Sequence, residues 1–563
     1  MNRSYISYFI VLITLVSICL EVKSQDLFVN AAGERIQACT DRTMYVSGEK
    51  VFFSVVVFNE KNITPEEFSR TFYCELITPD GKKIADGKYL LQNSTGQGCL
   101  TIPDEIISGI YFLKFYTRFM RNISAVEYKY IILKIINPIK TEVLSWNDTP
   151  DTTDMAGKNR ELPAGDHSLN ILSGKKNFSP REEIRLNIRG INGKELPAML
   201  CLSVIPESSF RDMFFSVKNE LSPEKNGVYF PETRSISLSG QLMAKESGKP
   251  VPDAKVNLSI IGDKDILVVY TDSSGRFFFT LPAYHGNKDI FLCASDLPEI
   301  TPEILIDNDF CSKPVNLSSP RFTMNEEEMK TAYKLAVDFR ITSMFKTDTL
   351  ASDSTGEENN ASFYGEPSDV LVLDKYIDLP TLEEYFSEIP MMVKVKKVRG
   401  RKQFRFNNTQ AEMSMYDPLV LVDWVAMNDI EKILAMSPGE IERIELVTSP
   451  YVKGSITYGG IISFVSKKND FAGIDLPKSG TFVNYKFLED CVEDHPSTPI
   501  PRNIPDSRNT IYWNPSVQTN DDGTADISFL APDTPGKYCI LLRGISKTGE
   551  VVLTKKMVVV SGK

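Results

Sequence analysis

Few residues of this 563-residue chain have the types and spacing that catalysis or metal binding requires. Its three histidines, His167, His285 and His495, each stand alone in a segment typical of a loop. A zinc-binding helix needs two histidines on one face, and a nucleophilic triad needs a base near its nucleophile. The chain also lacks a Gly-x-Ser-x-Gly motif and a phosphate-binding loop. We therefore predict no catalytic, cofactor-binding or metal site, no cofactor and no enzymatic activity, and we expect the histidines to be surface residues.

The nine cysteines are the next candidates, because thiolates act as nucleophiles and metal ligands. They are scattered without a Cys-x-x-Cys pair, and Cys74 lies in a run typical of a buried strand. We expect most of them to be unpaired structural thiols. Cys293 and Cys311 are a plausible local disulfide if the protein is exported, but sequence alone leaves the connectivity open.

One short stretch concentrates positive charge, although the chain has a formal net charge of −11. Two interpretations of this stretch stay open. It could bind an anionic partner such as lipopolysaccharide or an acidic protein face. Alternatively, it is a hairpin with solvated lysines, whose Val393, Val395 and Val398 face the core. The acidic balance elsewhere argues against a nucleic-acid partner. The basic residues are Lys394, Lys396, Lys397, Arg399, Arg401, Lys402 and Arg405.

The N-terminus predicts export. Arg3 precedes an apolar run over residues 8–20. The sequence Val22-Lys23-Ser24 then places small residues where a signal peptidase requires them. This pattern is typical of a secretory signal, so we interpret residues 1–24 as a removed signal peptide. An uncleaved anchor is less favoured, because the run is shorter than the ~20 residues that span a bilayer. We expect no transmembrane segment after cleavage, and a place in the periplasm or at the outer membrane.

The remaining elements are mostly predicted strands. Residues 30–140 hold short alternating runs bounded by turns, which is the pattern of an antiparallel β-sandwich. Residues 167–232 predict a second sandwich. Within it, residues 177–186 repeat the order of residues 45–51: an aromatic residue, a turn, an acid and then a strand.

Two segments of the first predicted sandwich carry a family resemblance. Residues 40–51 and 108–122 resemble the opening and the final strand of macroglobulin-like domains of large exported Bacteroidetes proteins. Macroglobulins that trap proteases carry a thioester in a Cys-Gly-Glu-Gln sequence. No cysteine of this chain is followed by Gly-Glu-Gln, so the resemblance does not imply covalent trapping.

Residues 236–312 resemble the carboxypeptidase-regulatory-like sandwich, on the strength of residues 248–256 and 271–277. The Asp-Ser-Ser-Gly sequence within the latter predicts a hairpin turn, after which Phe277, Phe279 and Leu281 alternate into a core. No peptidase site is implied by this module. Residues 313–367 predict a helix followed by a flexible linker, with Thr323 to Glu326 as a capping box.

Residues 368–470 resemble the plug domain of TonB-dependent outer-membrane transporters. The resemblance lies in residues 416–425, 437–447 and 456–468. It implies a surrounding barrel of about 22 strands, or ~220 residues. Because 95 residues follow Lys468, we expect that this chain does not itself form that barrel.

Residues 500–563 resemble the closing β-sandwich of the same Bacteroidetes proteins, and a type IX secretion signal domain is the rival interpretation. The expected fold is therefore mainly β and multidomain, with tandem antiparallel sandwiches of macroglobulin or immunoglobulin-like type and a small α/β plug-like domain. The expected function is that of an exported, non-enzymatic binding or scaffold protein that contacts an envelope protein or outer-membrane component. The alternative is an accessory component of a TonB-dependent outer-membrane uptake system, with a separate barrel as partner.

Overall fold

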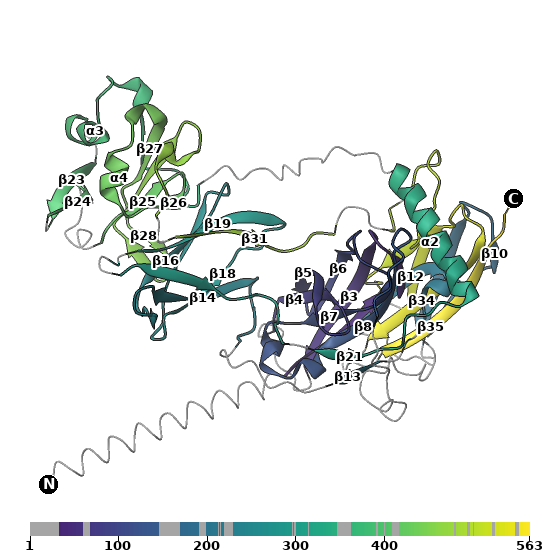
Figure 1. Cartoon of the computed structure of the whole chain (residues 1–563). Helices are drawn as coiled ribbons and strands as arrows, with labels where there is room; N and C mark the ends of the chain where they lie inside the picture. Colours follow the sequence, from purple (N-terminus) through teal and green to yellow (C-terminus); the bar gives the residue numbers. More distant parts are fainter. Residues whose placement is uncertain are drawn as a thin grey trace, which may run out of the picture. The chain divides into compact units, whose positions relative to one another are not determined.

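The computed structural model divides the chain into two compact units (Figure 1). The first comprises residues 1–235, 310–349 and 488–563, and the second residues 236–309 and 350–487. The predicted signal peptide and most of the predicted linker lie outside the described residues. The structure describes residues 33–59, 68–145, 169–190, 199–211, 213, 215–218, 229–295, 297, 300–313, 315–345, 362–389, 392–398, 400–407, 416–477, 480–491, 496–498, 500–518, 520, 524–545 and 551–562.

The first unit begins with a β-sandwich, which we call the first sandwich. Its strands follow one another in the order β1-β3-β6-β5-β4-β7-β8-β2, and β5 pairs with β4 along most of its length and with β6 at its end. Aromatic residues such as Phe53, Phe72 and Tyr89 fill its core, where their rings stack or meet edge to face. The strands are β1 (Glu34–Thr40), β2 (Met44–Val46), β3 (Lys50–Asn59), β4 (Thr71–Ile77), β5 (Lys83–Gln92), β6 (Thr95–Thr101), β7 (Gly109–Tyr116) and β8 (Lys129–Ile136).

The second sandwich combines two regions that are far apart in sequence. One sheet has the order β10-β35-β34-β12-β32 and the other β33-β11-β9. The prediction of separate sandwiches over residues 167–232 and 500–563 is therefore wrong. Each region supplies only part of both sheets, so neither could bury its apolar face alone. The strands are β9 (Leu169–Ser173), β10 (Asn177–Phe178), β11 (Glu183–Gly190), β12 (Met199–Pro206), β32 (Tyr512–Asn514), β33 (Thr524–Leu530), β34 (Gly536–Ile545) and β35 (Val551–Val560).

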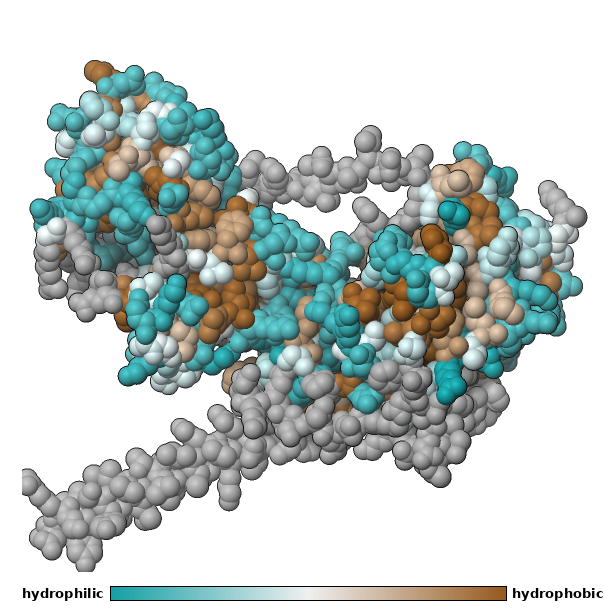
Figure 2. Space-filling view, viewed as in Figure 1, coloured by the Kyte–Doolittle hydropathy of each residue, from teal (hydrophilic) through white to brown (hydrophobic). Residues whose placement is uncertain are grey.

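Helix α2 (Glu326–Phe345) covers β2 of the first sandwich and confirms the predicted helix. Its N-terminus differs from the prediction by two residues, because the reciprocal capping bonds join Asn325 and Glu328. Leu335 is buried against the first sandwich, whereas Met329 and Tyr333 are exposed. Figure 2 shows hydrophobic side chains on this part of the surface.

Apolar side chains and sulfur atoms join the two sandwiches. Cys99 of β6 forms a disulfide with Cys491, in the segment that leads toward β32. The Cys39 and Cys201 thiols hydrogen-bond to each other in the same cluster. The predicted Cys293–Cys311 pair is wrong, since both residues are free and buried and belong to different units. Six of the described cysteines form no disulfide, as expected for structural thiols.

The second unit opens with a third sandwich over the predicted carboxypeptidase-regulatory-like region. The predicted turn is present: Asp272 accepts hydrogen bonds from Ser274 and Arg276, and Phe277 and Phe279 are buried. Its sheets have the orders β15-β14-β18, with β20 beside β14, and β17-β16-β19-β31. The strands are β14 (Ser237–Ala244), β15 (Lys249–Pro250), β16 (Lys255–Ile260), β17 (Asp265–Tyr270), β18 (Arg276–Thr280), β19 (Asn287–Ser295), β20 (Pro302–Ile306) and β31 (Thr481–Lys486).

The rest of the second unit is an α/β part built on the mixed sheet β22-β27-β30-β25-β26. Asp423 and Trp424, both with positive φ, make the tight turn between β25 and β26. Two further pairs, β23-β24 and β28-β29, form two-stranded sheets. The elements are β22 (Asp369–Val372), α3 (Leu382–Glu388), β23 (Val393–Val398), β24 (Arg401–Phe406), β25 (Leu419–Val422), β26 (Val425–Ala426), α4 (Ile430–Leu434), β27 (Ile441–Val447), β28 (Tyr451–Lys453), β29 (Ile456–Tyr458) and β30 (Ile461–Ser466).

Short elements complete the described chain, which is mainly β as predicted. In the residues that the structure describes, no helix is long and apolar enough to cross a bilayer. The short elements are the strands β13 (Ser216–Lys218) and β21 (Asn316–Ser318), which pair with each other, and the 3-10 helices η2 (Phe119–Asn122), η3 (Ala125–Glu127), η6 (Glu207–Ser209), η7 (Leu373–Lys375), η9 (Pro438–Glu440) and η10 (Phe471–Gly473).

Candidate binding groove

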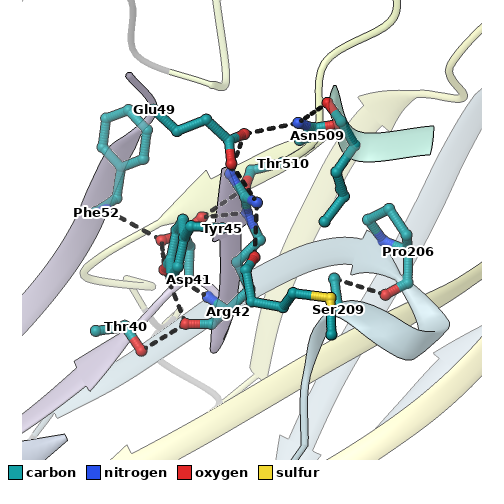
Figure 3. Close-up of polar contacts among 12 residues, drawn as sticks. Thr40, Asp41, Arg42, Tyr45, Glu49, Phe52, Pro206, Ser209, Asn509 and Thr510 are labelled. Atoms are coloured by element: carbon teal, nitrogen blue, oxygen red, sulfur yellow. Dashed lines mark hydrogen bonds and ion pairs between the residues drawn. The ribbon is translucent and has the colours of Figure 1, made fainter. Parts of the chain in front are cut away.

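A buried polar network lies where the first sandwich meets the second. It is built on the Thr40–Val51 segment, whose tight turn leads from β2 into β3 (Figure 3). Gly48 in this turn has φ +84°, a conformation that favours glycine. An added Cβ would lie 2.5 Å from the Asp104 carboxylate. The turn therefore requires glycine, and it places Glu49 inside the protein.

Glu49 is the acceptor at the centre of the network. Its Oε1 accepts hydrogen bonds from Arg42 Nη2 at 2.6 Å and from Asn509 Nδ2 at 2.6 Å. Its Oε2 accepts from Arg42 Nη1 at 3.0 Å and from the Val46 amide at 2.7 Å. Each carboxylate oxygen thus accepts two donors, which is what a buried carboxylate needs to offset its lost hydration.

Asp41 is the second acceptor. It accepts hydrogen bonds from the Tyr45 hydroxyl at 2.7 Å, from the Phe52 amide at 3.0 Å and from the Thr510 hydroxyl at 2.5 Å. The Arg42 guanidinium stacks on the Tyr45 ring, 4.2 Å from its centroid, and its Nε donates to Thr510. All these side chains are buried. Thr510 comes from the C-terminal region, so the network joins segments more than 450 residues apart.

The electrostatics of the network keep Arg42 and Tyr45 in fixed protonation states. Burial alone would lower the pKa of Arg42, but the carboxylates of Glu49 and Asp41 outweigh it and raise that pKa. Burial, reinforced by the Asp41 charge, raises the pKa of the Tyr45 hydroxyl well above its usual value. Arg42 therefore stays charged and Tyr45 stays neutral near pH 7, so neither acts as a base there.

Beside the network is a cavity of about 390 Å³, which we call the α2 groove. The Thr40–Val51 segment and its partners form one part of its lining, and the end of α2 together with seven residues between Pro496 and Arg508 forms the rest. Apolar side chains predominate in these walls, among them Phe339, Phe345 and Ile500. The lining residues are Arg42, Gly48, Glu49, Lys50, Phe52, Phe339, Thr342, Ser343, Phe345, Pro496, Thr498, Ile500, Pro501, Ile504, Pro505, Arg508, Asn509 and Thr510.

Asn509 gives the groove a polar feature of its own. Its Nδ2 donates to Glu49 and to the Leu335 carbonyl, which fixes the orientation of the amide because both partners are acceptors. Its Oδ1 is buried and has no hydrogen-bond partner among the described residues. Arg508, in contrast, is held by Asp506 and by the Pro496 and Thr498 carbonyls. The groove therefore offers apolar surface and hydrogen-bonding atoms, without a nucleophile placed beside a free base.

The structure describes one of the three histidines. His285 is exposed, as predicted, whereas His167 and His495 lie outside the described residues. No group of three or more potential metal ligands occurs within the part of the chain that the structure describes.

The basic stretch forms the hairpin β23-β24, as one of its two interpretations requires. Val393 is buried and Val395 is partly buried, but Val398 is 37% exposed. The prediction for Val398 is wrong because side chains alternate with period two. Val398 lies on the face of Lys394 and Lys396. Arg399 lies outside the described residues.

Sequence reasoning did not find the network or the groove. Residues 40–51 stand out in the sequence only by their resemblance to macroglobulin-like domains. Nothing in the sequence links them to their partners Asn509 and Thr510, which fall in the predicted C-terminal sandwich. The signal available in the sequence is three charged residues, Asp41, Arg42 and Glu49, shortly before the apolar run of residues 51–58, since charges that become buried require partners.

No protein-family model and no curated protein matches the chain. Among solved structures it is similar to Salmonella alpha-2-macroglobulin reacted with methylamine, at 9% identity and a TM-score of 0.23, over 94% of this chain and 39% of that one. It is similar to native Escherichia coli alpha-2-macroglobulin at 10% identity and a TM-score of 0.23, over 94% and 40%. Dimeric latent PorU from Porphyromonas gingivalis gives 10% identity and a TM-score of 0.16, over 48% and 34%.

The chain thus spans about two fifths of the length of these macroglobulins. TM-scores this low carry no argument about function. The architecture described above follows from the strands and sheets of this chain.

Proposed function

We propose that this protein is an exported, non-enzymatic binding or scaffold protein of the cell envelope, and that the α2 groove receives an apolar segment of a partner protein. The observation that carries the proposal is the groove's make-up. Most of the lining side chains that come from α2 and from between Pro496 and Pro505 are apolar, and the charged side chains of the network beside the groove are already bound to one another. Pockets of this kind bind by shape and apolar contact, with a few polar atoms that orient the ligand.

The chemistry of the lining favours a protein segment over a small charged ligand. Phe339, Phe345 and Ile504 offer apolar contacts, and Pro501 and Pro505 stiffen the segment that carries Ile504. A periplasmic or outer-membrane location agrees with the signal-like N-terminus.

Site-specific photo-crosslinking tests this proposal in the full exported chain. A benzoylphenylalanine in place of Phe345, which lines the groove, should crosslink to a discrete envelope protein. The same group in place of the neighbouring Met344, which is 80% exposed and does not line the groove, should not. The change Ile504→Asn, in the part of the lining that does not come from α2, should abolish the product formed at position 345.

Three results would contradict the proposal. Equal products from positions 344 and 345 would show that the contact is not specific to the groove. A product that survives Ile504→Asn would place the partner elsewhere. Detection of a hydrolytic activity that is lost on a single side-chain change would make the protein an enzyme.

We also infer that residues 368–470 are related to plug domains. This relationship supports the alternative function, that of an accessory component of a TonB-dependent uptake system. The mixed sheet β22-β27-β30-β25-β26, with the short helices α3 and α4, agrees with a small α/β module. An accessory role would require that envelope pull-downs recover a separate outer-membrane barrel or a TonB-family protein. Loss of that partner on deletion of residues 368–470 would support the role, and its absence from the wild-type pull-down would remove it.

A further inference from the structure

The β23-β24 hairpin concentrates charge in a way that the fold does not require. Residues 393–406 contain seven basic and no acidic residues, in a chain with a net charge of −11. The hairpin is a two-stranded antiparallel sheet. Its inner face contributes Val393 and Phe404 to the core of the α/β part.

The register places like charges directly opposite each other. Lys394 lies opposite Arg405, and Lys397 lies opposite Lys402. Like charges in such positions destabilise a sheet, so the stability of the hairpin does not explain this arrangement.

The protein neutralises only some of these charges. Lys402 pairs with Glu383 at 2.7 Å, and Arg405 pairs with Asp417 at 2.5 Å. Lys394, Lys396 and Lys397 are exposed, and they have no ion pair with any residue that the structure describes. The remaining positive charge is therefore available to a partner.

We propose that the outer face of this hairpin, formed by Lys394, Lys396 and Val398, binds an anionic membrane surface through the phosphates of lipid head groups. Lysine suits this partner, since each basic residue near an anionic bilayer adds long-range attraction without a fixed geometry. Protein interfaces are instead depleted of lysine and rely on buried aromatic and arginine anchors. The exposed Val398, between cationic neighbours, adds a small apolar contact with the lipid interface.

A rival explanation is that the lysines protect exposed strand edges from pairing with other chains. Edge protection requires charge of either sign, whereas a phosphate surface requires positive charge. Reversing the sign therefore separates the two explanations. The proposal is independent of the α2 groove, so a failure of the groove experiment leaves it standing and its own failure leaves the groove standing.

The test measures co-sedimentation of the full chain with vesicles of phosphatidylcholine and phosphatidylglycerol, compared with phosphatidylcholine alone. Binding should require phosphatidylglycerol and should weaken as salt is added. Lys394→Gln with Lys396→Gln should weaken binding about 30-fold, from ~1 kcal/mol per lysine. Lys394→Glu with Lys396→Glu should abolish it.

The matched control reverses two exposed lysines elsewhere in the same unit, Lys245→Glu with Lys249→Glu, and should retain most of the binding. Two outcomes overturn the proposal. If the wild-type chain ignores anionic vesicles, the hairpin does not serve a lipid surface, and an acidic protein face becomes the alternative. If both reversal variants lose binding equally, the effect is one of net charge and not of this hairpin.

Discussion

The same turn occurs in the first and second sandwiches, at residues 45–49 and 178–182. In each turn the final glutamate accepts a hydrogen bond from the amide three residues earlier, at 2.7 Å from Val46 and 2.8 Å from Ser179. The residue before each glutamate has a positive φ, +84° at Gly48 and +61° at Arg181. The predicted sequence repeat is therefore a repeat of backbone conformation.

The two turns also occupy equivalent places in their sheets. Each follows a short strand that pairs in parallel with a longer one, β2 with β8 and β10 with β35. The glutamate carbonyl then accepts from the amide of Ile102 in one sandwich and Ala531 in the other.

The surroundings of the two glutamates differ. Glu49 is buried and bound to Arg42 and Asn509, whereas Glu182 pairs with Lys175 near the surface, where the two side chains are 33% and 52% exposed. One local conformation thus serves two purposes. In the first sandwich its glutamate anchors the network beside the groove, whereas in the second the long-range contacts are made by Arg181, which binds Asp533 and the Ile500 and Ile504 carbonyls.

The largest expected difference between the turns concerns their glutamates. Glu49→Gln leaves Arg42 charged and buried without its main partner, which should cost roughly 3 kcal/mol of unfolding free energy. Glu182→Gln removes a surface ion pair and should cost less than about 1 kcal/mol. Urea unfolding followed by tryptophan fluorescence measures both, since Trp513 is buried between the two sandwiches. Equal costs would show that the network does not depend on Glu49.

The two residues with positive φ, Gly48 and Arg181, should differ less in the unfolding free energy that is lost on substitution. Gly48→Ala adds a Cβ 2.5 Å from the Asp104 carboxylate and 3.1 Å from the Phe339 ring, and should cost about 2 kcal/mol. Arg181→Ala keeps a Cβ that the turn already tolerates. It loses the ion pair with Asp533 together with hydrogen bonds to the Ile500 and Ile504 carbonyls, for roughly 1 kcal/mol. Thermal unfolding of the two variants checks the order, and a larger loss for Arg181→Ala would reverse the comparison.

The aromatic residues that begin the two turns, Tyr45 and Phe178, can each be replaced by the residue found in the other turn. Tyr45→Phe removes the hydroxyl donor to Asp41 and should cost about 1 kcal/mol. Phe178→Tyr places a hydroxyl at a buried position, so it should also destabilise rather than improve the second sandwich. Guanidinium unfolding of both variants measures the effect. Stabilisation by Phe178→Tyr would show that the second turn can accommodate a polar group of this kind.

The contributions of one carboxyl group in each sandwich, Glu34 and Asp533, should change with pH in opposite directions. These are the smallest effects on stability in this series. In the first, burial raises the pKa of Glu34, against hydrogen bonds from Thr117 and Ser69. Its contribution is present below its ordinary pKa and is lost as pH rises through the raised value. In the second, the hydrogen bond from Arg181 lowers the pKa of Asp533. That contribution is present above the ordinary pKa and is lost as pH falls through the lowered value.

Unfolding of Glu34→Gln and Asp533→Asn beside the wild-type chain, between about pH 3 and pH 7, checks these signs. The loss of unfolding free energy caused by Glu34→Gln, relative to wild type, should become smaller as pH rises. The loss caused by Asp533→Asn should become smaller as pH falls. The same slope for both variants would contradict the assignment.

Local patterns predicted much of the secondary structure. The strands within residues 30–140, the turn at Asp272 and the helix α2 were all expected, because each depends on residues close together in sequence. The equivalence of residues 45–51 and 177–186 was also visible. The exposure of Val398 could have been predicted by counting along the strand with period two.

The connections across the chain could not be predicted this way. The joining of residues 167–232 with 500–563 in one sandwich, and the disulfide between Cys99 and Cys491, depend on pairings hundreds of residues apart. Many such pairings satisfy the same hydrophobic pattern.

The sequence by itself therefore determined a mainly β chain, its strands, its turns and the concentration of positive charge in residues 393–406. Only the tertiary structure decided that Glu49 meets Arg42 and Asn509 beside a groove, while Glu182 remains near solvent. The physical reason is that a turn's conformation depends on neighbouring residues, whereas burial and the partners of a charge depend on which distant segments pack against it.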